Sequence, residues 1–320
     1  MAIVGILGGL AAIFVLLVVG TTLLTTKEPL EPVSPLSIPT FTPPTTLPTY
    51  RTSTTNADRE TTRPSPAVTR SHTAPVLNRS LKDNTLYKMG RLPSTRCPAG
   101  SASIYSHRQL KALILKTSKC LNREWSAGLE RLGIDFAPPH YAIVAGRGRG
   151  ACGDYPQRGS IVPYYCPRTM TIYASTTAMA KGSGNAIGYG QLASWHGAII
   201  SMMAHEYGHH VQNLTGVSDS WWRRTLDSGS QSARLALSRR LELQATCFGG
   251  MFMRSVAASY PVTPANRATL TYFYSHVGDW PGYPRDHGSP VNNNRWFHRG
   301  FDNNVANRCN TWRASTSSVS

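Results

Sequence analysis

The most apolar stretch of the chain lies at its start. Residues 3–24 are almost wholly apolar, and residues 1–26 contain no Asp, Glu, Lys or Arg. About 20 such residues cross the hydrocarbon core of a bilayer as a helix. The alternative is a secretory signal peptide, which has a basic segment before its apolar run and small residues at its cleavage site. Residues 1–26 have no such basic segment, and GTTLL at 20–24 is a poor cleavage site. We therefore predict an uncleaved transmembrane signal-anchor over residues 1–26.

The apolar pattern stops abruptly after the anchor. Residues 27–76 contain ten prolines and seventeen serines or threonines. Such a composition cannot bury enough apolar surface to fold and favours extended conformers. Residues 27–83 are therefore predicted to be a disordered stalk that holds the rest of the chain away from a membrane.

Regular hydrophobic periodicity begins near residue 84 and ends near residue 312, which predicts one folded domain over 84–312 and a disordered tail over 313–320. Spacing of three and four residues between apolar positions is typical of a helix, whereas short β-branched and aromatic runs are typical of strands. Residues 159–175 have the second character and predict one or two strands. Helices are predicted over residues 106–132, 195–213, 231–258, 264–277 and 290–301. One small sheet followed by several helices predicts an α+β fold.

The cysteines indicate where this domain resides. All six follow the anchor: Cys97, Cys120, Cys152, Cys166, Cys247 and Cys309. An even number in the exported part predicts three disulfides, of fifteen possible pairings, and we favour the pairing of sequence neighbours. Lys27, the first basic residue, argues weakly for a cytoplasmic C-terminal side. The cysteines argue the opposite, so we predict a single-pass membrane protein with its C-terminal domain extracytoplasmic.

Charge narrows the list of partners only slightly. Lys plus Arg number 33 against 16 Asp plus Glu, giving a formal net charge of +17. A basic surface attracts anionic polymers, so polymers of the cell envelope are candidate partners. No basic run or aromatic-basic motif typical of nucleic-acid binding is present, so no nucleic-acid partner is expected. The acidic residues are more informative, because only seven are glutamates.

The segment His205–Gln212 reads HEYGHHVQ. On a helix, His205 and His209 project from one face, because residues four apart lie one above the other. Two imidazole nitrogens so placed bind one Zn²⁺, and Glu206 between them can reach water at the metal and act as general base. This motif predicts a zinc hydrolase.

A catalytic zinc needs a third protein ligand and an open position. Glu242 is the only glutamate after Glu206 and falls in an apolar helical run, where an unpaired carboxylate is costly to bury. Coordination would remove that cost, so Glu242 is the first candidate. A salt bridge to Arg239 or Arg240, or simple exposure to solvent, would remove it too. As third ligand, the alternatives are His210, His276, His287 or an aspartate.

With these residues in place, the chain resembles the putative neutral zinc metallopeptidase family. The resemblance rests on HEYGHHVQ and on LELQATCFGG at Leu241–Gly250. Further matching segments are NTLYKMGRLPSTRCP at Asn84–Pro98, YYCP at Tyr164–Pro167, HGS at His287–Ser289, RWF at Arg295–Phe297, GF at Gly300–Phe301, and Cys309. The resemblance implies a zincin-like fold, one zinc ion per chain bound by His205, His209 and Glu242, and Glu206 as catalytic acid/base. Protein or peptide would be the substrate.

Two positions depart from the family pattern. The family has Asp four residues after the ligand glutamate, where this chain has Thr246; a hydroxyl can still accept a hydrogen bond from a ligand histidine. The family's Gly-Asp-Asp appears as Gly278-Asp279-Trp280. Thr246 motivates an alternative function, a catalytically silent zinc-containing binding module at the envelope.

Peptide hydrolysis also needs a hydrogen-bond donor for the developing oxyanion. We predict that His287 has this role, because Asp286 beside it could orient its ring. Tyr283 is the second candidate.

Overall fold

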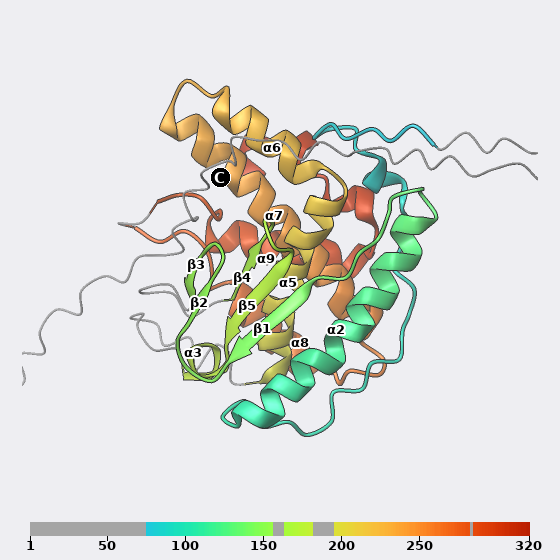
Figure 1. Cartoon of the computed structure of the whole chain (residues 1–320), viewed down its shortest axis with the longest axis vertical. Helices are drawn as coiled ribbons and strands as arrows, with labels where there is room; N and C mark the ends of the chain where they lie inside the picture. The colour runs from blue at the N-terminus through green and yellow to red at the C-terminus, as the bar shows by residue number, and fades with distance from the viewer. Residues whose placement is uncertain (1–74, 156–162, 182–194, 282–283) are drawn as a thin grey trace, which may run out of the picture. The chain divides into compact units, whose positions relative to one another are not determined.

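The computed structural model describes residues 75–155, 163–181, 195–281 and 284–320 (Figure 1). Seven α-helices and two small sheets make up this part of the chain, which confirms the predicted α+β class. The helices are α2 (His107–Glu130), α3 (Thr176–Lys181), α5 (His196–Leu214), α6 (Val217–Leu226), α7 (Gln231–Ser255), α8 (Pro264–Tyr274) and α9 (Pro290–Asn303).

Capping side chains explain where four of these helices begin. Ser106, Ser230, Thr263 and Ser289 each accept a hydrogen bond from the backbone N–H three residues later, at the start of α2, α7, α8 and α9. Such a cap satisfies one of the free N–H groups of the first turn. Five predicted helices are present, and their ends differ from the prediction by at most three residues. Helices α3 and α6 were not predicted.

The larger sheet has the strand order β1-β5-β4. Strands β1 (His140–Val144) and β5 (Thr171–Ser175) are parallel, and β4 (Tyr164–Cys166) is antiparallel to β5. The second sheet is a hairpin of β2 (Gly148–Gly150) and β3 (Gly153–Tyr155). Strands β4 and β5 confirm the strands predicted within 159–175, of which 159–162 lie outside the described residues. Strands β1 to β3 were missed.

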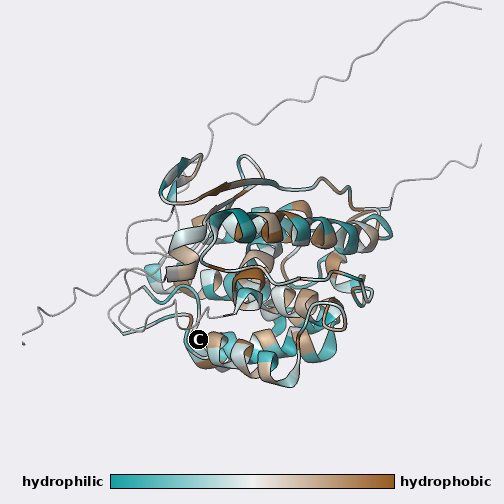
Figure 2. Ribbon diagram, turned by 90° about the horizontal axis from the view of Figure 1, so that it is seen from below, coloured by the Kyte–Doolittle hydropathy of each residue, from teal (hydrophilic) through white to brown (hydrophobic). Residues whose placement is uncertain are grey.

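Helices α5 and α7 lie side by side at the centre of the molecule (Figure 1). Their backbones approach closely at Gly208 of α5, where a Cβ atom would lie 2.9 Å from the Cα atom of Ala245. Only glycine allows this approach. Trp125 of α2 packs edge-on against Phe248 of α7, with ring centroids 5.3 Å apart. Apolar and polar positions alternate along the helices around this core (Figure 2). The close crossing brings residues of α7 next to the histidines of α5.

Three disulfides join Cys97 to Cys120, Cys152 to Cys166 and Cys247 to Cys309. These are the neighbour pairs that the sequence favours. The first joins the segment before α2 to that helix, and the second joins the β2–β3 hairpin to β4. The third joins α7 to the short 3₁₀ helix Ala306–Cys309. Disulfides of this kind indicate an oxidising compartment.

The predicted anchor, residues 1–26, and most of the predicted stalk lie outside the described residues. Within the described ranges, no helix has the length and apolar character that a membrane span requires. The last residues of the predicted stalk are not disordered, in contrast to the prediction. The backbone carbonyls of Asn78 and Arg79 accept hydrogen bonds from the N–H of Thr85 and the hydroxyl of Ser220.

The prediction of a disordered tail over residues 313–320 is wrong. Thr316–Ser318 forms a 3₁₀ helix, and Val319 is buried in the core. Side chains of α9 hold this segment, because Asn292 donates to the carbonyls of Ser317 and Ser320, and Trp296 donates to that of Ser318. The acceptors are backbone carbonyls, which every residue has, so the amino-acid composition of residues 313–320 does not reveal these hydrogen bonds.

Candidate metal centre

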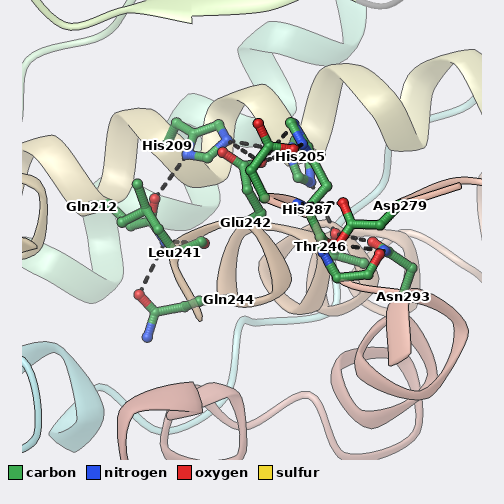
Figure 3. A network of polar contacts seen from close by, with 12 residues as sticks. His205, His209, Gln212, Leu241, Glu242, Gln244, Thr246, Asp279, His287 and Asn293 are labelled. Atoms are coloured by element: carbon green, nitrogen blue, oxygen red, sulfur yellow. Dashed lines mark hydrogen bonds and ion pairs between the residues drawn. The ribbon is translucent and has the colours of Figure 1, made fainter. Parts of the chain in front are cut away.

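The three predicted ligands converge between α5 and α7 (Figure 3). His205 Nε2 and His209 Nε2 each lie 3.2 Å from the same oxygen, Glu242 Oε2. The two Nε2 atoms are also 3.2 Å apart. The histidines come from consecutive turns of α5, and Glu242 comes from α7 opposite them. The structure therefore brings two imidazoles and one carboxylate to a common point.

Thr246 determines which nitrogen of His205 carries a proton. Its Oγ1 lies 3.1 Å from His205 Nδ1 and donates to Asn293 Oδ1 at 3.2 Å. A hydroxyl has one proton to donate. Thr246 must therefore accept from His205, so Nδ1 carries a hydrogen and a neutral His205 presents a lone pair at Nε2.

The side-chain amides of Gln212 and Gln244 determine which nitrogen of His209 carries a proton. Gln212 Nε2 donates to the carbonyl of Leu241 and to Gln244 Oε1, so its other amide atom, Oε1, faces His209 Nδ1 at 2.9 Å (Figure 3). An amide oxygen only accepts, hence His209 Nδ1 carries the hydrogen. Gln244 is held in turn by donating to Tyr87 and to the carbonyl of Cys309. Both histidines thus direct Nε2 toward Glu242.

This donor set fits zinc. A tetrahedral zinc ion with ligand atoms at 2.0–2.1 Å separates those atoms by about 3.3–3.4 Å, close to the 3.2 Å of each pair. Three lone pairs at that spacing repel one another unless a cation lies among them. His205, His209 and Glu242 are the residues that would hold the ion.

The titration behaviour of the cluster also favours a bound cation. Burial disfavours the charge of Glu242, but His209 and His287 outweigh burial and hold the pKa of Glu242 well below its usual value. Burial likewise opposes the charge of His209, yet Glu242 raises the pKa of His209 to about 9. Burial dominates at His205 and lowers its pKa. In the absence of a metal ion, a protonated His209 therefore pairs with the carboxylate of Glu242, and a bound metal ion would displace that proton.

Glu206 lies on α5 between the two histidines, with 6% of its surface exposed. Burial raises the pKa of Glu206 to about 8, while the neighbouring His209 acts in the opposite direction. A carboxylate with a pKa in this range can both take and return a proton near neutral pH.

His287 comes from the loop before α9. Its Nε2 lies 3.7 Å from Glu242 Oε2, and its Nδ1 is hydrogen-bonded to Asp286 Oδ1 at 2.6 Å. Asp279 holds the same loop by accepting from the backbone N–H groups of His287 and Gly288. Burial disfavours a charged His287, but Glu242 and Asp286 outweigh it and raise its pKa to about 10. A donor thus faces the candidate metal centre. Tyr283 lies outside the described residues.

The other candidates for third ligand lie elsewhere. His210 contacts the carbonyl of Ala137 through Nε2 and the hydroxyl of Tyr165 through Nδ1, and burial lowers its pKa to about 4. His276 contacts the carbonyl of Tyr272. The salt bridge to arginine is also absent from the described residues, because Arg239 and Arg240 donate to backbone carbonyls.

Three residues that orient the ligand histidines were not predicted: Gln212, Gln244 and Asn293. Gln212 lies three residues after His209, so its position on the same helical face was an available signal. Asn293 lies 47 residues after Thr246, and only the fold brings the two together.

Comparison with known proteins agrees with this geometry. Residues 88–266, more than half of the chain, match the sequence model of the family described as "Putative neutral zinc metallopeptidase". The chain belongs to this family. The matched range contains both histidines of α5 and Glu242 of α7, and the family name implies zinc as the bound metal.

Two uncharacterized bacterial proteins are similar to this chain. The uncharacterized protein YpfJ of Escherichia coli K12 is 26% identical over 201 residues, which cover 60% of this chain and 67% of YpfJ. The uncharacterized protein Rv2575 of Mycobacterium tuberculosis H37Rv is 25% identical over 250 residues, covering 69% and 76% respectively. No solved structure matched the chain.

Proposed function

We propose that this protein is a membrane-anchored, extracytoplasmic metallopeptidase that uses one zinc ion per chain to hydrolyse peptide bonds. One observation carries the proposal. The Nε2 atoms of His205 and His209 and the Oε2 atom of Glu242 form a triangle with sides of 3.2 Å, and Glu206 lies beside it. This donor set matches that of a zincin-like catalytic centre, in which three protein ligands leave one position of a tetrahedral zinc ion open to water.

Glu206 moves the proton. When bound, zinc supplies Lewis acidity, which polarises a carbonyl and acidifies water. Glu206 takes a proton from the attacking water and passes it to the leaving amine, so that the amine departs as a neutral molecule. Its buried position shields this proton transfer from bulk water.

His287 stabilises the charge that develops on the substrate oxygen. The hydrogen bond from Nδ1 to Asp286 orients the ring, and because the raised pKa of His287 keeps both ring nitrogens protonated, Nε2 can donate on the side that faces Glu242. Donors fixed in advance at the position of a developing oxyanion contribute on the order of 3 kcal/mol each. Asp286 and Asp279 keep the ring and its backbone in place.

An extended peptide is a suitable substrate for this site. Strand β4 pairs with β5 on one side only among the described residues, and it lies against α5, where Tyr165 contacts His210. A free strand edge offers backbone donors and acceptors to another extended chain. A peptide lying along β4 would place its backbone next to the turn of α5 that carries Glu206.

Anionic polymers of the envelope are proposed as partners of the surface. Helix α2 exposes Arg108, Lys116, Lys119 and Arg123, called here the basic face of α2. No ion pair neutralises these four side chains within the described part of the chain. They extend along about 22 Å of helix, which suits a linear polyanion.

The alternative function, a silent zinc-containing module, was motivated by Thr246. The Thr246 hydroxyl lies 3.1 Å from His205 Nδ1, where the family's aspartate would be expected to accept. Because the accepting role is filled and the base Glu206 is present, the geometry favours the enzyme.

The test is hydrolysis of a library of fluorogenic peptides by the purified protein and by Glu206→Gln. We expect the variant to keep one zinc ion and to lose turnover by several orders of magnitude, because only the base is removed. Equal hydrolysis by both proteins, or none by the zinc-loaded wild type, would reject the peptidase assignment.

A further inference from the structure

Asn293 is a buried amide on the first turn of α9, and it has partners on both sides. Its Oδ1 accepts from the hydroxyl of Thr246. Its Nδ2 lies 3.1 Å from the carbonyl of His287, 2.9 Å from that of Gly288 and 3.3 Å from that of Ser289. One side chain therefore contacts both the residue behind His205 and the loop that carries His287 (Figure 3).

In each hydrogen bond between His205, Thr246 and Asn293, only one of the two atoms can be the donor. His205 Nδ1–H donates to Thr246, and Thr246 donates to Asn293 Oδ1. The amide orientation of Asn293 is fixed, because carbonyls surround Nδ2 and only a donor can face them. Reversing any one bond would place two donors or two acceptors against each other. The lone pair of His205 at the metal centre thus depends on an amide two hydrogen bonds away.

We propose that Asn293 is a positioning residue that links the metal ligand His205, through Thr246, to the loop of the oxyanion donor His287. The inference rests on the proposed zinc peptidase function. Asn293 uses its oxygen to set the tautomer and ring direction of His205, and its nitrogen to hold the loop over the site. Two uncharged side chains, those of Thr246 and Asn293, together take the place of the aspartate that the family has at position 246.

The chemistry of the amide explains why asparagine is required. Aspartate at 293 would still accept from Thr246, but its second oxygen would face three carbonyl oxygens and repel them. Leucine of similar size would offer neither group. The two functions of the residue can therefore be removed separately by substitution.

The experiment measures zinc affinity by competition with a chelator, together with kcat and KM for peptide hydrolysis and thermal stability. The full chain is compared with Thr246→Val, Thr246→Ser, Asn293→Leu, Asn293→Asp and the double variant Thr246→Val/Asn293→Leu. Asn294→Leu, at the next position of the same helix, is the control. Loss of a group that orients a ligand histidine weakens metal binding by about 10–100-fold.

We expect Thr246→Val and Asn293→Leu to weaken zinc binding in that range, while Thr246→Ser and Asn294→Leu stay near wild type. The double variant should bind zinc no more weakly than Thr246→Val, because Asn293 acts on the metal only through Thr246. Asn293→Asp should keep zinc but lower kcat with little change in KM, since only the loop of His287 is released.

Three results would overturn the proposal. One is that the zinc losses of the two single variants add in the double variant. Another is that Asn293→Leu changes thermal stability to the same extent as Asn294→Leu and leaves zinc affinity, kcat and KM unchanged. The third is a wild-type chain that binds no zinc. A wild type that binds zinc but hydrolyses no peptide rejects the peptidase function, while the zinc measurements still decide the link between Asn293 and His205.

Discussion

Glu124 is a buried carboxyl group that predicts how the stability of this domain changes with pH. It lies on α2 with none of its surface exposed, and it accepts a hydrogen bond from Ser255 through Oε2. Its Oε1 has no hydrogen-bond partner among the described residues. Burial raises the pKa of Glu124 to about 8 from an ordinary value of 4.5, and the hydrogen bond from Ser255 opposes that rise only in part.

The sign of the effect follows from proton binding. Between about pH 4.5 and about pH 8 the folded protein keeps the proton of Glu124, whereas the unfolded chain has lost it. Stability is therefore fully present below the unfolded pKa and is lost as pH rises toward the folded value. The slope is about 1.4 kcal/mol per pH unit, which amounts to about 3 kcal/mol between pH 5 and pH 7.

The substitution Glu124→Gln removes this proton and therefore this slope. We expect its free energy of unfolding, measured by denaturant titration at several pH values with disulfides intact, to fall less steeply with pH than that of the wild type. Glu130→Gln, an exposed glutamate at the end of the same helix, is the control and should keep the wild-type slope. Parallel curves for wild type and Glu124→Gln would refute the reasoning.

Three further predictions concern the site and the surface. Glu242→Ala should reduce zinc from one ion per chain to a weakly held fraction in elemental analysis; equal, tight zinc in both proteins would contradict its role as ligand. Gly208→Ala should destabilise the fold by about 1–3 kcal/mol and weaken zinc binding, because its Cβ would lie 2.9 Å from the backbone of α7. Gly229→Ala, which meets open space, should change neither. Charge reversal at Lys116 and Lys119 should abolish salt-sensitive binding to a phosphate-bearing polymer without lowering peptide hydrolysis, and retained binding would exclude the basic face of α2.

The helices that carry the site were predictable because their signals are local. Spacing of four residues on one helix is enough to place His205 and His209 together. Glu242 followed from the scarcity of glutamate and the cost of burying a carboxylate. The ends of α7 and α9 were close to prediction, since apolar periodicity and the prolines near helix starts are properties of neighbouring residues.

The features that were missed depend on contacts between distant residues. Strands β2 and β3 are three residues each and rich in glycine, so their pairing has little pattern. The tail around Val319 is polar in composition but is held by side chains of α9. Asn293 is one of three consecutive asparagines, and sequence does not indicate which of them faces Thr246. Long-range hydrogen bonds of this kind are decided by the fold.

The disulfide between Cys247 and Cys309 makes the metal centre dependent on the redox state of its surroundings. Cys247 directly follows Thr246, and the bond closes a loop of 62 residues that contains both His287 and Asn293. Closing a loop of that length stabilises a fold by about 4 kcal/mol. In a reducing compartment the segment that carries His287 and Asn293 would lose this covalent link to α7. Before this bond forms, only packing and hydrogen bonds hold the segment from α8 to the 3₁₀ helix Ala306–Cys309 against α7.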